Sequence, residues 1–343
     1  MMRILHLLGH APDFQTQRGV LLLSGGAGDE FSFTQRTIGH DGTYRNTLAA
    51  VIGLGMRPEA FDLIHAWDDR ALQATMLAFG QGVVFSPIQR PSPTSLAWLR
   101  LAITQRELRV VCATAAQQRG LETVGIRNEY LSLIRPGIDP GHARIRRDRS
   151  LRRALGFADD DYVLLPAGES TRAAGHRDAV WAASILHVLD PRYRVLLWGQ
   201  GDQTPRLERL AEKLRQPGLL VNAQRALGRR VEFEELLGAA DVALHTPSAI
   251  GPELPIATAI AAGLPTVLWG SGALAECLGA AASIAIVSPP SARLLAQRVL
   301  KIRENPELGR GIAHAAGVEV RKAYSSDRFV EQYGSLYRSM GVA

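Results

Sequence analysis

Short apolar runs alternate with longer stretches of helical spacing along almost the whole chain. In the first half, apolar runs of strand length occupy residues 3–8, 19–24, 61–67, 82–87, 108–114 and 130–136. Amphipathic patterns of helical period follow several of these runs, as at 69–80 and 95–105. Strands that alternate with helices in this rhythm are typical of a mostly parallel sheet covered by helices on both faces.

The stretch 135–150, RPGIDPGHARIRRDRS, interrupts this rhythm. Its prolines and glycines indicate an interdomain linker. After it, we predict strands at 161–168, 193–201, 241–247, 265–270 and 282–290, and helices at 176–190, 204–216, 233–240 and 252–263. The fold class is therefore α/β, with two doubly wound Rossmann-like domains at 1–138 and 139–324. A C-terminal helix at 325–343 is expected to pack back toward the first domain.

Local signals refine some of these elements. Thr204 followed by Pro205 predicts a helix with Thr204 as its N-cap. In the same way, Gly251 and Pro252 predict a helix that starts at Pro252, with Glu253 in its first turn. The segment 9–46 shows no helical period, and its glycine-rich run 24–30 is either a phosphate-cradling turn or a plain surface loop.

Length and composition limit the broad class of protein. The 343 residues suffice for two domains, and 46% apolar with 21% charged residues is typical of globular proteins. No apolar run approaches the roughly 20 residues of a membrane span, and residues 4–8 are interpreted as a first strand rather than a signal peptide. Cys112 and Cys277 are expected to be buried thiols, so we expect a cytoplasmic protein.

The formal net charge of +6 has two interpretations. The arginines reflect the amino-acid usage of the genome, or they form a basic face for anionic ligands or for peripheral contact with the inner face of a membrane. The densest cluster, 144–153, has no interleaved aromatic residues, which argues against a nucleic-acid partner, and its arginines are expected to be solvated. No residues have the spacing of metal ligands.

An ordered series of segments carries a family resemblance. The segment 233–278, FEELLGAADVALHTPSAIGPELPIATAIAAGLPTVLWGSGALAECL, follows VLLPAGESTRAAGHRDAVWAA and VLLWGQGDQTPRLERLAEKL, and FDLIHAWD and LIRPGID occur in the first half. This series resembles the family 4 (group 1) glycosyltransferases of GT-B fold, whose two domains face a cleft. The resemblance implies a retaining, metal-independent hexosyl transfer without a bound cofactor. A nucleotide-sugar on the second domain would be the donor, and the acceptor would be an unidentified carbohydrate or a lipid-linked one.

The chain departs from the family pattern at charged positions. The family's two donor-site glutamates fall on Ile250 and Thr258, and its Arg and Lys of the first loop fall on Glu169 and Ala174. Each charge-assisted contact that is lost is worth about 1.5–3 kcal/mol. We therefore expect either a remodelled donor site or a catalytically inactive GT-B protein that binds a ligand or a partner. A nucleotide-sugar epimerase or phosphorylase-like activity is a further alternative.

The candidate site combines residues from both domains. The catalytic candidates are His65, Arg172 and Glu253. The substrate-binding candidates are the loop residues Gly168, Glu169, Arg177 and Gly199 and the helix-start residues Gly251, Pro252, Leu254 and Thr258. His10, His40, Asp41 and His176 are further polar candidates.

Each of these has a structural alternative. Arg172 and Arg177 are equally explained as exposed loop charges, and Glu253 as a carboxylate that stabilises a helix dipole. His65 is equally explained as a residue that packs at the end of a strand.

Overall fold

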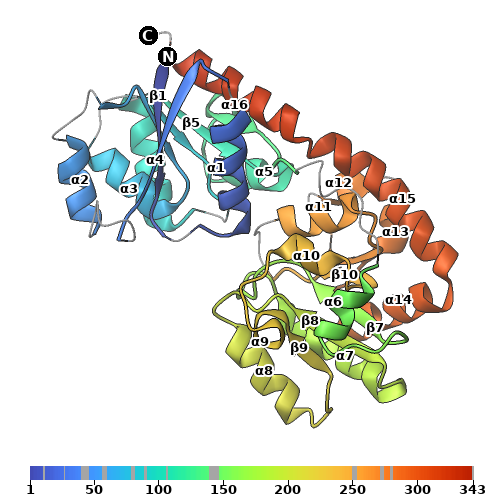
Figure 1. Cartoon of the computed structure of the whole chain (residues 1–343). Coiled ribbons are helices and arrows are strands. Elements are labelled where there is room, and N and C mark those ends of the chain that lie inside the picture. The colour runs from blue at the N-terminus through green and yellow to red at the C-terminus, as the bar shows by residue number, and fades with distance from the viewer. Residues whose placement is uncertain are drawn as a thin grey trace. The chain divides into compact units, whose positions relative to one another are not determined.

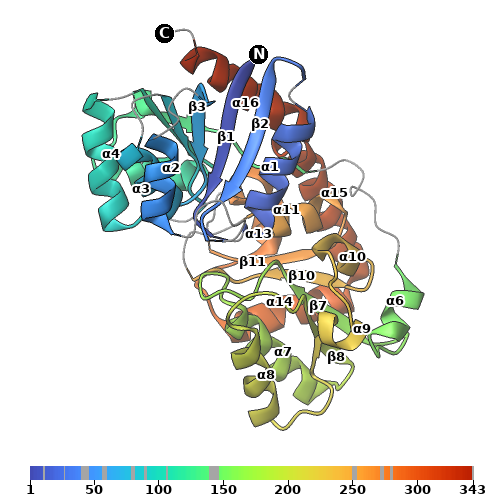
Figure 2. The same cartoon turned by 60° about the vertical axis from the view of Figure 1, so that its left-hand side comes forward.

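The computed structural model describes residues 1–10, 12–26, 28–39, 46–55, 60–78, 82–88, 91–105, 107–138, 147–248, 253–270, 274–278 and 281–341. Contacts divide the chain into two compact units, Met1–Gly137 with Ser325–Ala343, and Ile138–Tyr324. The first boundary lies after residue 137, one residue before the boundary expected after 138, and the second lies after residue 324. Figure 1 and Figure 2 show each unit as a sheet with helices against its faces.

The N-terminal unit contains a parallel sheet of strand order β2-β1-β3-β4-β5-β6. Its strands are β1 (Met2–Leu8), β2 (Phe31–Thr37), β3 (Leu63–Ala66), β4 (Gly82–Phe85), β5 (Leu108–Cys112) and β6 (Leu131–Leu133). The helices between them are α1 (Phe14–Gly26), α2 (Thr47–Gly55), α3 (Asp69–Ala78), α4 (Pro93–Gln105) and α5 (Ala115–Thr123), with a 3-10 turn η2 (Asn128–Tyr130). Successive residues of β1 enter different cores, Leu5 and Leu7 on one face and Ile4 and Leu8 on the other, because side chains alternate along a strand.

The apolar run 19–24 belongs to helix α1, which corrects the strand predicted there. Val20 and Leu23 are buried on one side of this helix, whereas Leu21 is 54% exposed. Asp13 Oδ1 accepts a hydrogen bond from the Thr16 backbone at 2.8 Å and caps the helix start. A short continuous apolar run does not distinguish strand from helix by its period alone. The edge strand β2 arises instead from 31–37, within the segment expected to be irregular.

Helix α16 (Ser326–Met340) belongs to the N-terminal unit. Phe329, Tyr333, Tyr337 and Met340 recur at helical spacing and are buried in the core on the α1 side of the sheet. Both views show α16 beside α1 (Figure 1 and Figure 2). The last helix thus completes the core of the unit that begins the chain.

The C-terminal unit contains a parallel sheet of order β12-β11-β10-β7-β8-β9. Its strands are β7 (Tyr162–Pro166), β8 (Tyr193–Leu197), β9 (Leu220–Asn222), β10 (Val242–His245), β11 (Thr266–Trp269) and β12 (Ile286–Val287). Its helices are α6 (Arg149–Ala154), α7 (His176–Leu189), α8 (Thr204–Lys213), α9 (Ala223–Leu227), α10 (Phe233–Leu237), α11 (Leu254–Ala261), α12 (Leu274–Leu278), α13 (Ala282–Ala285), α14 (Ala292–Glu304) and α15 (Pro306–Ala323).

The strand order of this unit marks one position for ligands. The chain proceeds from β7 outward to β9 and then returns to the opposite side of β7 with β10. In doubly wound sheets, ligands bind outside the carboxyl ends of the two strands at which the direction changes. Here these strands are β7 and β10, and we call their carboxyl ends the switch point of the C-terminal unit.

Three local predictions for this unit need correction. The strand predicted at 282–290 begins as helix α13 at 282–285, and β12 is confined to 286–287. Helix α8 already includes Thr204, and Gln203 occupies its N-cap position. Arg152 is fully buried rather than solvated, because its guanidinium donates to the carbonyl oxygens of Ala239 at 2.7 Å and Asp161 at 2.5 Å.

Candidate functional site

The loop after β7 approaches the segments after β10 and at the start of α11 so closely that it requires glycine. Gly168 has φ +87°, and a Cβ added there would lie 2.8 Å from Cγ of Pro255. Gly175 has φ +65°, and its Cβ would lie 1.8 Å from the carbonyl oxygen of Thr246. Both positions combine a left-handed backbone with a lack of space, so a side chain is excluded by two independent causes.

Backbone hydrogen bonds join the loops at the switch point. The Ser170 backbone donates to the Gln200 carbonyl at 2.7 Å and accepts from Gln203 at 2.8 Å. Ser248, which follows β10, donates from its hydroxyl to the Arg172 carbonyl at 2.8 Å. Gly199 supports the loop after β8, since its φ is +98° and an added Cβ would lie 2.3 Å from Oδ1 of Asn222. The loops after β7, β8 and β10 therefore form one supported edge.

His176, the first residue of α7, points into the protein. Its Nε2 lies 3.2 Å from the Ala167 carbonyl, and its Nδ1 lies 3.1 Å from the Ser170 hydroxyl. A carbonyl only accepts, so Nε2 carries the proton and Nδ1 accepts from Ser170. Burial lowers the pKa of His176 to about 4, although the bond to Ala167 opposes the shift. The ring is neutral at pH 7 and supports the loop; it does not supply the mobile cation that the sequence suggested.

Arg172 and Arg177 line one cavity of about 720 Å³ at the switch point. We call it the α7–α8 cavity, because the start of α7 and the length of α8 form its walls. It is lined by Thr171, Arg172, Gly175, His176, Arg177, Asp178, Gln203, Arg206, Leu207, Arg209, Leu210, Lys213 and Ser248. Asp178 is the one carboxylate among these lining residues, against five Arg or Lys side chains. The cavity is therefore suited to an anionic ligand.

Three of these cations come from α8 and were not among the predicted site residues. Arg206, Arg209 and Lys213 are spaced i, i+3 and i+7, which places them on one face of the helix. Glu208 and Glu212 lie on the other side, and Glu208 pairs with Arg225 at 2.9 Å, away from the cavity. This segregation of charge was the signal in the sequence that could have identified the α8 residues.

Glu253 occupies the N-cap position of α11 rather than its first turn, because the helix begins at Leu254 and carries Pro255 at its start. The Tyr324 hydroxyl donates to Glu253 Oε2 at 3.2 Å, and Tyr324 is fully buried. Glu253 is thus oriented by a residue at the end of the C-terminal unit. Gly251 and Pro252, together with Ile250, lie outside the described residues.

Thr258 and Leu254 are both buried, Thr258 with 3% of its surface exposed. The Thr258 hydroxyl donates to the Leu254 carbonyl one turn earlier at 2.8 Å. Such back-bonding is common for threonine within helices. The hydroxyl already donates within α11, and the residue is buried, which together argue against the predicted role of Thr258 in substrate binding. Gly168, Glu169 and Gly199 lie at the same edge of the sheet but do not line the α7–α8 cavity.

His65 belongs to the core of the N-terminal unit and is 0% exposed. Its Nδ1 and Nε2 lie 2.7 Å from the hydroxyls of Tyr337 and Ser86, respectively. Its ring stacks on Trp67 with centroids 4.0 Å apart. Burial, with a smaller effect of His6, lowers the pKa of His65 well below its usual value. Both ring nitrogens have partners within the unit, which argues against a catalytic role for His65 and favours the alternative of packing at the end of a strand.

The switch point of the N-terminal unit, at the carboxyl ends of β1 and β3, presents a different side chain. Asp68 accepts hydrogen bonds from the Gly9 backbone at 2.6 Å and from the Ala71 backbone at 2.9 Å. Arg70 donates to the Gly9 carbonyl at 3.1 Å. The predicted candidate His10 is exposed beside them, whereas His40 and Asp41 lie outside the described residues. An acidic residue directly after a buried strand was the signal that could have identified Asp68.

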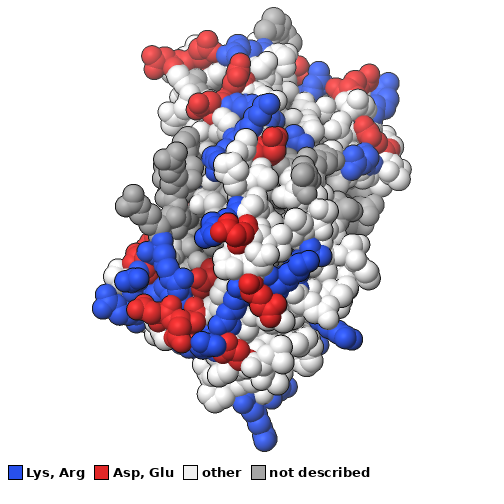
Figure 3. Space-filling model, turned by 90° about the vertical axis from the view of Figure 1, so that its right-hand side faces the viewer, with Lys and Arg blue, Asp and Glu red and all other residues white. Residues whose placement is uncertain are grey.

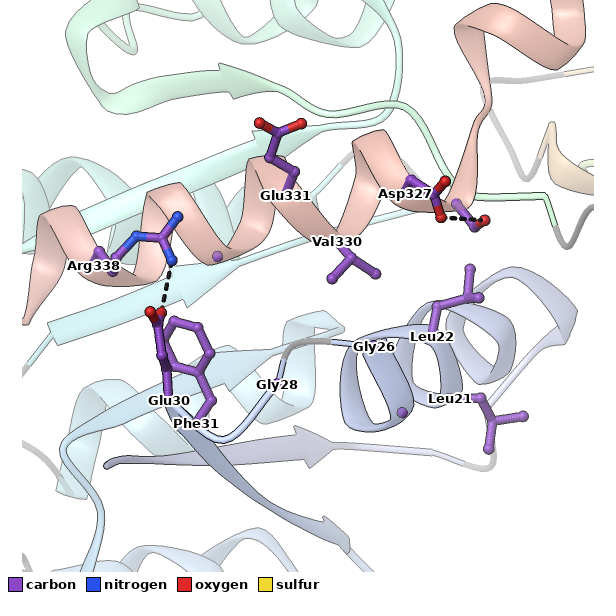
Figure 4. Close-up of a pocket in the computed structure, with 13 residues that line it drawn as sticks. Leu21, Leu22, Gly26, Gly28, Glu30, Phe31, Asp327, Val330, Glu331 and Arg338 are labelled. Carbon is purple, nitrogen blue, oxygen red and sulfur yellow. Dashed lines mark hydrogen bonds and ion pairs between the residues drawn. The ribbon is translucent and has the colours of Figure 1, made fainter.

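A second large cavity, of about 710 Å³, lies between α1 and α16 (Figure 4). Leu21, Leu22, Phe31 and Val330 supply its apolar side chains, and Gly26 and Gly28 belong to the glycine-rich run 24–30. Glu30 pairs with Arg338 at 2.8 Å, so the one arginine that lines the cavity is already neutralised. Further acids, Asp327 and Glu331, line it as well. This environment disfavours phosphate and argues against the phosphate-cradling interpretation of 24–30.

Neither a membrane helix nor a metal cluster occurs in the part of the chain that the structure describes. None of the helices there combines the length and the apolar character that a bilayer span requires. No group of three or more His, Cys, Asp or Glu side chains there is arranged to hold a metal ion. The face shown in Figure 3 carries Lys and Arg interspersed with Asp and Glu, so the net positive charge does not form a uniform basic surface on that side.

Comparison with known proteins identifies the family. Residues 148–317 match the model of the family described as glycosyl transferases group 1. Over 227 residues the chain is 24% identical to the EpsD protein of Bacillus subtilis (strain 168), which is named as a glycosyltransferase; the match covers 64% of this chain and 56% of that relative's length.

Two solved structures are similar over 99% of this chain. HepE of Anabaena, in complex with UDP and glucose, has a TM-score of 0.82 at 20% identity over 100% of its chain. Sucrose-phosphate synthase of Thermosynechococcus elongatus has a TM-score of 0.78 at 16% identity over 99% of its chain. The chain therefore has the GT-B fold and belongs, through residues 148–317, to the group 1 glycosyltransferases.

Proposed function

We propose that this protein transfers a sugar from a nucleotide-sugar to a hydroxyl group of a carbohydrate or lipid-linked acceptor, with retention and without a metal ion or bound cofactor. The observation that carries the proposal is the α7–α8 cavity, because it places Arg172 and Arg177 together at the switch point of the domain that matches the family. Retention and independence of metal follow from the family resemblance and remain part of the proposal.

This reaction requires positive charge held near the diphosphate leaving group. When the bond between sugar and diphosphate breaks, negative charge develops on the departing phosphate oxygens. Arg172 and Arg177 are both exposed at the cavity, and the ion pairs among the described residues of this unit involve neither of them. We assign them to the diphosphate, in place of the Arg and Lys that the family carries at the positions of Glu169 and Ala174.

The start of α7 adds to this charge. The helix has 14 residues, and its N-cap, Gly175, has no side chain to bind the free N–H groups of the first turn. The positive end of the helix dipole and these N–H groups therefore face the same region as Arg172.

Glu253 is the carboxylate that we assign to the sugar or ribose hydroxyls. Tyr324 holds one of its oxygens at 3.2 Å, which orients the carboxylate at the start of α11. A carboxylate that is already oriented loses less side-chain entropy when it accepts a hydroxyl. In this proposal Tyr324 is a positioning residue, and Glu253 replaces the two glutamates that the family carries at 250 and 258.

The test is calorimetric titration with UDP and UDP-glucose, chosen because HepE has been solved in complex with both. We expect binding, and we expect Arg172→Gln and Arg177→Gln each to weaken it by about tenfold or more, the worth of one charge-assisted contact. Arg149→Gln, an exposed arginine on α6 outside the cavity, is the matched control. Absence of binding by UDP, GDP and their sugars at millimolar concentration would reject the proposal for these donors.

One observation favours a second candidate function, a catalytically inactive GT-B protein that binds a ligand or a partner. Thr258 stands at one of the family's glutamate positions, but its hydroxyl donates to the helix backbone, so it does not replace the missing carboxylate. The inactive protein would bind nucleotide without turnover. A donor-hydrolysis assay that measures the release of free UDP separates the two candidates. An active transferase commonly transfers its sugar slowly to water, whereas an inactive protein would release no UDP.

A further inference from the structure

The cations of the α7–α8 cavity extend well beyond the region that a donor diphosphate can cover. Helix α8 begins after β8, at the carboxyl edge of the sheet, and runs back along the unit. From Arg206 to Lys213 the helix advances seven residues, about 10 Å at 1.5 Å per residue. Arg172 lies on the loop at one end of this row, and Lys213 is the last residue of the helix at the other end.

These α8 cations are not neutralised by the protein. Arg206 donates to the neutral Oε1 of Gln203 at 3.0 Å, and the ion pairs among the described residues of this unit include neither Arg206 nor Arg209 nor Lys213. The acids of the same helix point away, with Glu208 held by Arg225 and Asn222. Like charges gathered in a concave site repel one another, and a bound anion relieves this repulsion.

The shape of the site limits the ligand. The residues line a half-open cavity of about 720 Å³ between the start of α7 and α8, and Arg206, Arg209 and Lys213 are exposed along it. Leu207 and Leu210 form part of the wall between the cations, which lowers the local dielectric and strengthens their attraction for an anion. One inorganic phosphate would contact only part of a row that is about 10 Å long.

We propose that the row Arg206, Arg209 and Lys213 binds a second ligand that carries two or more clustered phosphate groups, alongside the nucleotide-sugar. The site does not depend on the donor assignment, because it uses α8 residues to which the donor proposal gives no role. The phosphates belong either to a soluble polyphosphorylated molecule or to the headgroups of a phospholipid. Both kinds of ligand would bind in the same way: their phosphate groups would contact the guanidinium and ammonium groups that recur at regular spacing along α8.

The experiment uses the full chain and inorganic tripolyphosphate as the probe. Its affinity is measured calorimetrically at low ionic strength, with and without UDP. We expect the triple variant R206Q/R209Q/K213Q to bind at least about tenfold more weakly, because three charge-assisted contacts are removed. The control R149Q/R153Q/R293Q removes the same charge from exposed positions outside the cavity and is expected to stay within about twofold.

A second arm identifies the source of the phosphates. Flotation with phosphatidylcholine vesicles, with and without anionic phosphatidylglycerol, is performed on the wild type and both triple variants. Capture by anionic vesicles that is lost only in R206Q/R209Q/K213Q assigns the phosphates to lipid headgroups, whereas binding of free tripolyphosphate alone assigns them to a soluble ligand.

The proposal is overturned if neither probe binds, or if both triple variants weaken binding equally, since the latter indicates a response to net charge alone. UDP affinity is the readout that keeps the two proposals apart. We expect R206Q/R209Q/K213Q to bind UDP like the wild type. If UDP binds to neither the wild type nor any variant, the donor assignment is rejected, and the tripolyphosphate result still tests the second site.

Discussion

At the scale of single residues, the site depends on which polar side chains already form hydrogen bonds or ion pairs within the protein. His65, His176 and Thr258 carry chemically useful atoms, but each uses them in hydrogen bonds to its own unit. No ion pair among the described residues involves Arg172 or Arg177, and both line a cavity. These contacts, and not the residue type, decide whether a side chain supports the fold or can bind a ligand.

Gly175 provides a test at this scale. We expect Gly175→Ala to destabilise the C-terminal unit and to weaken nucleotide binding, because its Cβ would lie 1.8 Å from the Thr246 carbonyl oxygen. Gly228→Ala is the matched control, since Gly228 has φ +64° with nothing within 4 Å of an added Cβ. The left-handed backbone alone costs about 1–2 kcal/mol, so the excess loss in Gly175→Ala, measured by thermal unfolding, reports the clash. Equal losses in the two variants would show that the loop relaxes freely.

Tyr324 provides a second test. Tyr324→Phe removes the hydroxyl that contacts Glu253 at 3.2 Å and keeps the buried ring. If Glu253 contacts the donor sugar, we expect this variant to bind UDP normally but UDP-glucose about three- to tenfold more weakly, the worth of roughly one hydrogen bond. Equal affinities of the variant and the wild type for UDP-glucose would refute the positioning role.

At the scale of elements, charge and burial decide what each helix contributes. Helix α8 separates its cations from its acids, which gives the unit a basic wall at the cavity. Helix α6 instead turns Arg152 inward, where Arg152 Nη1 contacts Asp241 Oδ2 at 3.0 Å and the backbone that enters β10. Both helices contain more than one arginine, but those of α8 line the cavity, whereas Arg152 joins α6 to the sheet.

Arg152→Met tests the structural role of α6. We expect a loss of about 1–3 kcal/mol of stability, because the buried carbonyl groups of Ala239 and Asp161 would lose their donor, whereas Asp241 keeps Arg147 at 2.9 Å. The neighbouring exposed Arg153→Met is the control and is expected to change stability by no more than about 0.5 kcal/mol. Calorimetric unfolding gives both values, and a small effect of Arg152→Met would mean that the carbonyl groups around it find other donors.

At the scale of the whole molecule, buried histidines couple stability to pH in both units. Burial lowers the pKa of His6 to about 3 and that of His176 to about 4, and it also lowers the pKa of His65. In the unfolded chain these groups titrate near 6.5. Below that pH the unfolded state binds more protons than the folded state, so stability falls as the pH is lowered and is fully present above about pH 7.

The expected result is a lower melting temperature at pH 5.5 than at pH 7.5, with a loss of about 1.4 kcal/mol for each buried histidine. His65→Gln should reduce the pH dependence of the N-terminal unit, whereas His314→Gln, an exposed histidine on α15, should leave it unchanged. A pH dependence that is identical in the wild type and His65→Gln would show that carboxylates dominate in this range.

The sequence by itself determined the fold class and most of the alternating strands and helices. This was possible because the period of apolar residues is a local property, and alternation of strands and helices allows few topologies. The run 19–24 was one of the exceptions: its four consecutive apolar residues have no period, and packing against the sheet made it helix.

The tertiary structure alone decided which polar residues are available. Tyr337, which engages His65, lies 272 residues further along the chain, so no local pattern indicates that contact. Likewise, the five cations of the α7–α8 cavity come from one loop and two helices, and only the fold brings them to one site. Neighbours that are distant in sequence decide whether a polar side chain is already hydrogen-bonded. For that reason the family was readable from the chain, whereas the chain alone did not show which of the candidate residues line a cavity and which are buried in the core.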